Sequence, residues 1–184
     1  GVLLPGASPD TPWIEPLSSR VYDPLWAVCQ ELGMPITHHG GGSGIPKMPD
    51  SPVKNLIYVM EVGFYAHRAL WHLIWGGAFE RFPGLKLVLT EVGSDWVPPT
   101  LARMDGLFEQ MKRGRIGELG VPAEAVPTMK PSDIFKRNIW IGASFPAPSD
   151  AAVFRELGLD RVMWGSDYPH HEATSPYSRE SLRL

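Results

Sequence analysis

Hydrophobic residues fall into short apolar runs separated by longer amphipathic segments. Five runs are typical of strands: residues 2–5, 34–39, 85–91, 138–144 and 161–166. The clearest helical pattern covers 23–33, with Asp23 expected as N-cap, Pro24 at the first helical position and Gly33 just past the end. Further helices are expected over 53–82, with breaks near 62–63 and 76–77, over 97–114, over 149–158 with Ser149 as N-cap, and from 175 onward. Residues 114–131 are expected as loop, followed by a short turn.

The strand–helix alternation predicts an α/β fold with parallel strands covered by helices. An open doubly wound sheet and part of a (β/α)8 barrel both fit this order. Polar residues end the strands, namely His38, His39, Glu91, Ser144 and Asp167, as expected for a barrel that carries its site at that end. The glycines of "HGGGSG" offer a weaker alternative, a phosphate-binding loop in an open sheet.

His39 and Asp167 together suggest a divalent metal site. Imidazole nitrogen and carboxylate oxygen suit zinc, with manganese as the alternative, and a metal there could lower the pKa of a bound water. Adjacent strand residues point to opposite faces, so His39 is expected to face the site and His38 the helix layer. Taken singly, His39 could be a loop histidine and Asp167 a turn cap.

Glu91 and Asp167 are the expected catalytic groups. A carboxylate ending a buried strand is either paired or functional, so Glu91 is a general acid/base, a partner orienting a metal ligand, or half of a structural pair. His170 and Trp96 are the expected substrate-binding residues, His170 from the loop beyond Asp167 and Trp96 as a pocket wall. We expect His171 to be solvated, and His67 and His72 to serve packing or the surface.

Composition narrows the choices of partner. Of the 184 residues 43% are hydrophobic and 20% charged, and the formal net charge is −3. These values are typical of a soluble globular protein and argue against binding to nucleic acid or to a membrane surface. The expected partner is a small-molecule substrate. One cysteine, expected to be buried, excludes an internal disulfide framework. We expect a cytoplasmic protein that can form a homo-oligomer.

Three segments together resemble the amidohydrolase-related family: "GMPITHHGGGSG", "FERFPGLKLVLTEVGSDWVP" and "RVMWGSDYPHHEAT". The family comprises metal-dependent TIM-barrel hydrolases and decarboxylases such as aminocarboxymuconate-semialdehyde decarboxylase. The resemblance implies that His39 is a metal ligand ending the fifth strand. It implies that Asp167, ending the eighth, is a metal ligand and proton acceptor. Glu91 stands where the decarboxylase branch has a catalytic histidine.

The family's H-x-H pair of the first strand has no counterpart in this sequence. By resemblance, residues 1–184 are a single domain, truncated at the N-terminus and slightly at the C-terminus, with strands 4 to 8 of a partial (β/α)8 barrel and their helices. The function implied is metal-dependent hydrolysis or decarboxylation of a small carboxylated, aromatic or carbonyl substrate, with little activity in this chain alone. The alternative is a non-catalytic truncated barrel that acts as a binding or interaction module.

Overall fold

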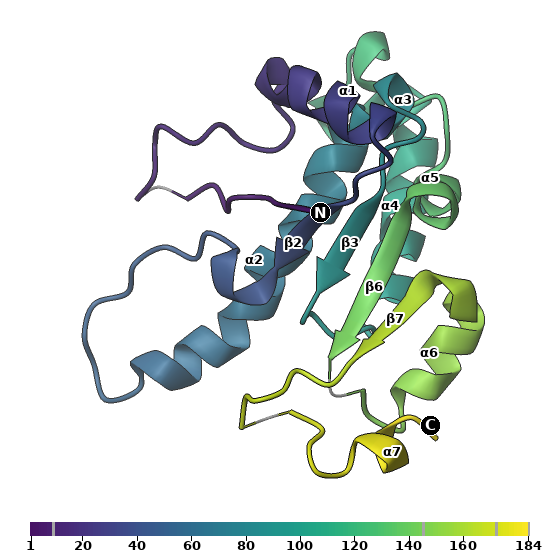
Figure 1. Cartoon of the computed structure of the whole chain (residues 1–184). Helices are drawn as coiled ribbons and strands as arrows, with labels where there is room; N and C mark the ends of the chain where they lie inside the picture. Colours follow the sequence, from purple (N-terminus) through teal and green to yellow (C-terminus); the bar gives the residue numbers. More distant parts are fainter. Residues whose placement is uncertain (9, 145, 172, 184) are drawn as a thin grey trace. The chain divides into compact units, whose positions relative to one another are not determined.

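The computed structural model describes residues 1–8, 10–144, 146–171 and 173–183. The chain divides into two compact units, Gly1–Leu89 and Thr90–Leu184, shown from purple to teal and from teal to yellow in Figure 1. The helices of the described residues include none long and apolar enough to cross a lipid bilayer.

The first unit contains parallel strands and two longer helices. The chain order is β1 (Val2–Leu3), η1 (Arg20–Tyr22), α1 (Asp23–Glu31), β2 (Ile36–His39), η2 (Gly40–Gly42), α2 (Lys54–Trp75), α3 (Ala78–Arg81) and β3 (Leu87–Thr90), whose last residue begins the second unit. Strand β1 pairs with β2 in parallel, Val2 opposite Ile36. Strand β3 lies on the other side of β2, and Ile36 N donates to Lys86 O at 2.9 Å.

The second unit continues the alternation. Its elements are α4 (Val97–Met111), β4 (Arg115–Ile116), β5 (Leu119–Gly120), η3 (Ala123–Ala125), α5 (Pro131–Asn138), β6 (Ile139–Ser144), α6 (Asp150–Leu157), η4 (Leu159–Arg161), β7 (Val162–Gly165) and α7 (Ser178–Ser181). Strands β6 and β7 pair in parallel, from Ile141 opposite Val162 to Ser144 opposite Gly165. The expected α/β fold with parallel strands is therefore confirmed.

Each unit buries one face of its helices. In the first unit, the carboxyl half of α2 buries residues at helical spacing: Ala66, Ala69, Leu70, Leu73 and Ile74. In the second unit, the buried set comes from α4, α5 and β6: Val97, Leu101, Met104, Phe108, Met111, Ile134, Phe135, Ile139, Ile141 and Ala143. Helix α4 packs against α5, and α5 against β6, which gives β6 a buried face.

Several local predictions are wrong. Helix α2 runs unbroken through Val62–Gly63, although the predicted break at Gly76–Gly77 is confirmed. The predicted loop 114–131 contains an antiparallel hairpin, β4–β5, closed by a two-residue turn. The segment expected as a short turn is helix α5, which starts at Pro131, a favourable first helical residue.

Of the two predicted helix caps, Asp23 is wrong because its side chain has another partner, whereas Ser149 is the N-cap residue of α6 as predicted. Asp23 is the first residue of α1, and its carboxylate accepts from Arg81 Nε at 3.0 Å and from Arg81 Nη2 at 2.8 Å. Ser149 precedes α6 without a side-chain capping bond. There the carboxylate of Asp150 accepts from Ala147 N at 2.8 Å instead.

Strand β7 is more exposed than its apolar sequence predicts. Met163 is 44% exposed and Trp164 38% exposed. Among the described strands, β7 has one hydrogen-bonded neighbour, β6. An edge strand of this kind leaves one side of its backbone open to solvent or to another strand.

Candidate functional site

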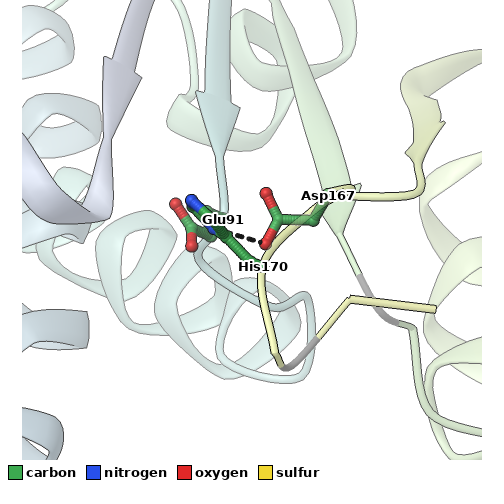
Figure 2. Close-up of side chains that lie close together, drawn as sticks. All are labelled: Glu91, Asp167 and His170. Atoms are coloured by element: carbon green, nitrogen blue, oxygen red, sulfur yellow. Dashed lines mark hydrogen bonds and ion pairs between the residues drawn. The ribbon is translucent and has the colours of Figure 1, made fainter. Parts of the chain in front are cut away.

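Three titratable side chains of the second unit come together where strands end. Glu91 follows β3, Asp167 follows β7, and His170 lies three residues further along the loop (Figure 2). Each offers one ligand atom, and these atoms lie within 4.8 Å of one another. His170 Nδ1 lies 2.9 Å from Asp167 Oδ2. The cluster therefore offers two carboxylates and one imidazole to a ligand at this edge.

The two carboxylates differ from His170 in exposure. The Asp167 side chain is 17% exposed, whereas the His170 side chain is 57% exposed. Glu91 is half-buried. The carboxylates thus form the inner part of the cluster and the imidazole its solvent-facing part, which leaves His170 accessible to a small molecule.

Both carboxylates stand on a left-handed backbone. Glu91 and Asp167 each have φ +57°, and they are the non-glycine residues with positive φ among the described residues. This conformation is uncommon for side chains other than Asn and Asp and costs free energy. The conformation occurs at both residues that supply the carboxylates. The backbone therefore turns sharply just after β3 and just after β7, at the positions of these side chains.

Close backbone packing holds Glu91 beside β6. A Cβ on Gly142 would lie 2.9 Å from Cγ2 of Thr90, so only glycine allows this approach. Glu91 N then donates to Gly142 O at 3.2 Å. On the other side of β6, the register with β7 brings Gly165 opposite Ser144. Strand β6 therefore lies between the ends of the two strands that carry the carboxylates.

The loop that carries His170 is closed by its own hydrogen bonds. His170 N donates to Asp167 O at 3.0 Å, and Ala173 N donates to His170 O at 3.1 Å. Thr174 N donates to Ser166 O at 3.0 Å. These bonds turn the loop back on itself, so that His170 faces the Asp167 carboxylate.

His38 and His39 occupy different environments in the first unit, as the strand alternation predicted. His38 is 2% exposed and lines a small cavity with Arg68 and His72 of α2. Burial lowers the pKa of His38 from 6.5 to about 4, and the positive charge of Arg68 adds to this effect. Burial also lowers the pKa of His72. His38 is therefore a neutral structural side chain at neutral pH.

His39 is half-buried and its ring faces its own loop. Its Nδ1 accepts from Gly41 N at 2.9 Å. A neutral imidazole that accepts at Nδ1 carries its proton on Nε2. Binding a metal through Nε2 requires the other tautomer, so it would replace the Gly41 contact. The pairing of His39 with Asp167 at one metal remains a prediction.

The remaining expected residues lie outside the cluster. Trp96 is half-buried, and its Nε1 donates to Gly93 O at 3.2 Å, which ties the indole to its own turn. His171 is exposed, in agreement with the expected solvated role. The contact of His170 with Asp167 was not anticipated. The three-residue spacing of Asp167 and His170 around a proline was the only sequence signal for it.

The chain belongs to the amidohydrolase family, whose model matches residues 1–183. It is 26% identical over 159 residues to gamma-resorcylate decarboxylase of Rhodococcus jostii (strain RHA1), a match that covers 80% of this chain and 44% of that protein.

Two solved structures share the fold. An amidohydrolase from Mycobacterium avium subsp. paratuberculosis K-10 has a TM-score of 0.67 and 24% identity, over 92% of this chain and 42% of that one. The 5-carboxyvanillate decarboxylase of Novosphingobium aromaticivorans DSM 12444, in complex with manganese and 4-hydroxy-3-methoxy-5-nitrobenzoic acid, has a TM-score of 0.67 and 20% identity, over 100% of this chain and 49% of that one. This chain thus spans about half the length of the proteins it matches.

Proposed function

We propose that this chain forms part of a metal-dependent enzyme that decarboxylates, or hydrolyses, small aromatic acids. The observation that carries the proposal is the convergence of Glu91, Asp167 and His170 at the strand ends of the second unit. Family membership and the similarity to a decarboxylase of an aromatic acid support it.

The donor set fits a divalent cation. Carboxylate oxygens and an imidazole nitrogen suit zinc or manganese, and ligands about 2.0–2.2 Å from one ion lie within about 4.4 Å of each other. The ligand atoms of the cluster lie within 4.8 Å, so small side-chain rotations suffice. We propose Asp167 of this cluster as a metal ligand. The resemblance to the family adds His39, which lies outside the cluster, as a second proposed ligand. The proposed ion is zinc or manganese; a related decarboxylase was solved with manganese. A bound cation would polarise a substrate carbonyl or carboxylate as a Lewis acid.

The protein's own groups would handle protons and orientation. In decarboxylation, the bond between the ring carbon and the carboxylate carbon breaks, carbon dioxide leaves, and a proton is delivered to the ring carbon. Asp167 and Glu91 are the proposed catalytic groups because they share the half-buried part of the cluster. His170 and Trp96 are the proposed substrate-binding residues, His170 because it is exposed beside Asp167. In hydrolysis the same carboxylates would accept a proton from water.

We also propose that β1, β2, β3, β6 and β7 take the places of strands 4 to 8 in a single (β/α)8 domain. The shared fold with structures about twice as long supports this assignment. Zinc sites normally have three or four protein ligands. If part of the ligand set comes from elsewhere in the full-length protein, this chain alone will bind metal weakly and turn over little substrate.

Product analysis tests the proposal. The full-length protein and this chain are incubated with 2,6-dihydroxybenzoate or 5-carboxyvanillate, with Mn²⁺ or Zn²⁺ and with EDTA. We expect carbon dioxide release by the full-length protein that EDTA abolishes, and release by this chain at least about 100-fold slower. Hydrolysis products without carbon dioxide would identify a hydrolase. Absence of turnover in every condition would support the non-catalytic binding module instead.

A further inference from the structure

The amino-terminal half of helix α2 exposes apolar side chains to solvent. Every residue from 55 to 61 is exposed, and all of them except Asn55 and Glu61 are apolar. Met60 is 82% exposed and Phe64 is 60% exposed. Figure 1 shows this half of the helix extending beyond β2. Exposed apolar residues gathered on one helix commonly mark a surface that binds a partner.

Four exposed residues form a stripe along this part of the helix. Val53, Ile57, Met60 and Phe64 follow one another at spacings of four, three and four residues. At about 100° per residue, the stripe lies on the side of α2 opposite the residues that its carboxyl half buries. Alternating spacings of three and four are those of the a and d positions at which two helices pack in a coiled coil.

The charges beside the stripe are complementary to those of an identical helix. Lys54 and Glu61 are the charged residues of segment 53–64, and they lie two turns apart on one flank of the stripe. In an antiparallel pair of α2 helices, Ile57 can face Met60 of the second copy while Lys54 lies beside Glu61 of the second copy. A shift by seven residues would bring Glu61 to Glu61 of the second copy, so the charges favour the first register.

The ion pair that Lys54 makes within its own chain does not prevent this contact. Lys54 Nζ lies 2.8 Å from Asp50 Oδ1, and the Asp50 side chain is 97% exposed. An exposed pair of this kind contributes little free energy, so the ammonium can turn toward a carboxylate of a second copy.

Completion of a barrel would leave the stripe uncovered. Successive strand–helix units of a (β/α)8 barrel stand side by side, so a further unit would attach beside β1, whose one hydrogen-bonded neighbour among the described strands is β2. The stripe lies on the opposite side of α2 from its buried residues and therefore faces away from the layer that such units extend.

We infer that the stripe of Val53, Ile57, Met60 and Phe64 is the contact between two copies of this protein, with their α2 helices antiparallel about a twofold axis. The apolar side chains form the centre of the contact, and the charged pairs at its two ends set the register. Because the contact is about three helical turns long, we expect a weak dimer that dissociates at low micromolar concentration.

Sedimentation equilibrium over a range of concentrations tests the contact in this chain and in the full-length protein. We expect a reversible dimer of both. Met60→Glu should weaken association at least about tenfold, because it places a carboxylate in the centre of the apolar contact. Asn55→Glu adds the same side chain at an exposed position of α2 outside the stripe and should leave association unchanged. Circular dichroism will show that both variants are folded.

Exchange of the charges tests the antiparallel register. Lys54→Glu and Glu61→Lys should each weaken self-association about threefold to tenfold, because like charges then meet at both ends of the contact. A mixture of these two variants should associate as tightly as the parent chain, because opposite charges meet again in the mixed dimer.

The inference is overturned if both proteins remain monomeric, if Met60→Glu dimerises as the parent does, or if the mixture associates no better than each variant alone. Binding to phosphatidylglycerol vesicles that Met60→Glu abolishes, without a dimer in solution, would assign the stripe to a membrane surface instead.

Discussion

The sequence contains two pairs of adjacent histidines, and the two pairs lie in different environments in the structure. His38 and His39 end strand β2, where one ring is buried and the other turns toward its own loop. His170 and His171 lie on the loop after β7, where His171 is exposed and His170 faces the Asp167 carboxylate. The same dipeptide therefore places one histidine in the core of the first unit and one histidine beside a carboxylate in the second.

The difference follows from the backbone that carries each pair. In a strand, neighbouring side chains point to opposite faces, so one histidine must enter the helix layer, and there it stays neutral. In the loop after β7, the backbone hydrogen bonds of His170 hold it beside Asp167. The buried histidine of the first pair is thus a packing residue, whereas the cluster at the strand ends of the second unit carries proposed chemistry. Substitutions at four positions, each with a control, test these assignments.

The largest effect is expected at Asp167. Asp167→Asn should lower the Mn²⁺ affinity of the chain by about 100-fold or more, because a carboxylate ligand becomes a neutral amide. Stability should change little, since Asn also tolerates a left-handed backbone. Calorimetric metal titration and thermal unfolding measure both quantities. Asp160→Asn, on a side chain 74% exposed and paired with Arg161, is the charge-matched control. Equal metal affinity in the two variants would contradict a metal role for Asp167.

His38 should control the acid stability of the chain. Its pKa is 6.5 when unfolded and about 4 when folded, so the unfolded state binds more protons between these values. The free energy of unfolding should therefore decrease as the pH falls from about 6.5 to about 4, by up to about 3 kcal/mol. Urea unfolding across this range measures the slope.

Substitution separates His38 from other titrating groups. His38→Gln should flatten most of that slope, whereas His171→Gln, at an exposed position, should keep it. His72 also has a lowered pKa and faces the same cavity, so a residual slope is expected from it. A slope unaffected by His38→Gln would show that His38 is not the buried neutral group described above.

A smaller effect is expected at the Arg81–Asp23 pair. Arg81→Lys should lower the free energy of unfolding by about 1–2 kcal/mol, because an ammonium cannot make the two parallel hydrogen bonds to Asp23. Arg81 also donates to Gly76 O at 2.7 Å. The control is Lys54→Met, which removes an exposed pair with Asp50 and should cost less than about 0.5 kcal/mol. An equal loss in the free energy of unfolding for the two variants would show that the Arg81–Asp23 pair contributes no more than an exposed surface pair.

The smallest effect concerns the left-handed backbone at Glu91. Glu91→Gly should be more stable than Glu91→Ala by about 1 kcal/mol, because only glycine adopts positive φ without a steric cost. Glu109 lies within helix α4, where alanine is favoured over glycine. There Glu109→Ala should be more stable than Glu109→Gly, by a similar amount. Chemical denaturation of the four variants measures both differences. Greater stability of Glu91→Ala than of Glu91→Gly would exclude strain at Glu91.

Much of the fold could be predicted from sequence because its signals are local. Apolar runs located the five parallel strands, and Pro24 with Gly33 located α1 within a few residues. The alternation of side chains assigned His38 to the helix layer. The hairpin β4–β5 was missed because its strands have two residues each, too few to show a period of two. The cap at Asp23 was wrong because Arg81, 58 residues away in sequence, binds that carboxylate.

The sequence by itself determined the strand–helix order, the polar residues at the strand ends and the likeness to amidohydrolases. Those properties depend on side-chain periodicity and local turn chemistry, which a linear pattern contains. Only the tertiary structure decided that His170 meets Asp167, that Glu91 and Asp167 share a left-handed backbone, and that Glu91 lies close to both. The approach of Glu91 to this pair depends on packing between segments that lie far apart along the chain, and the position of His170 depends on the backbone hydrogen bonds of its loop. The pattern of apolar and polar residues records neither.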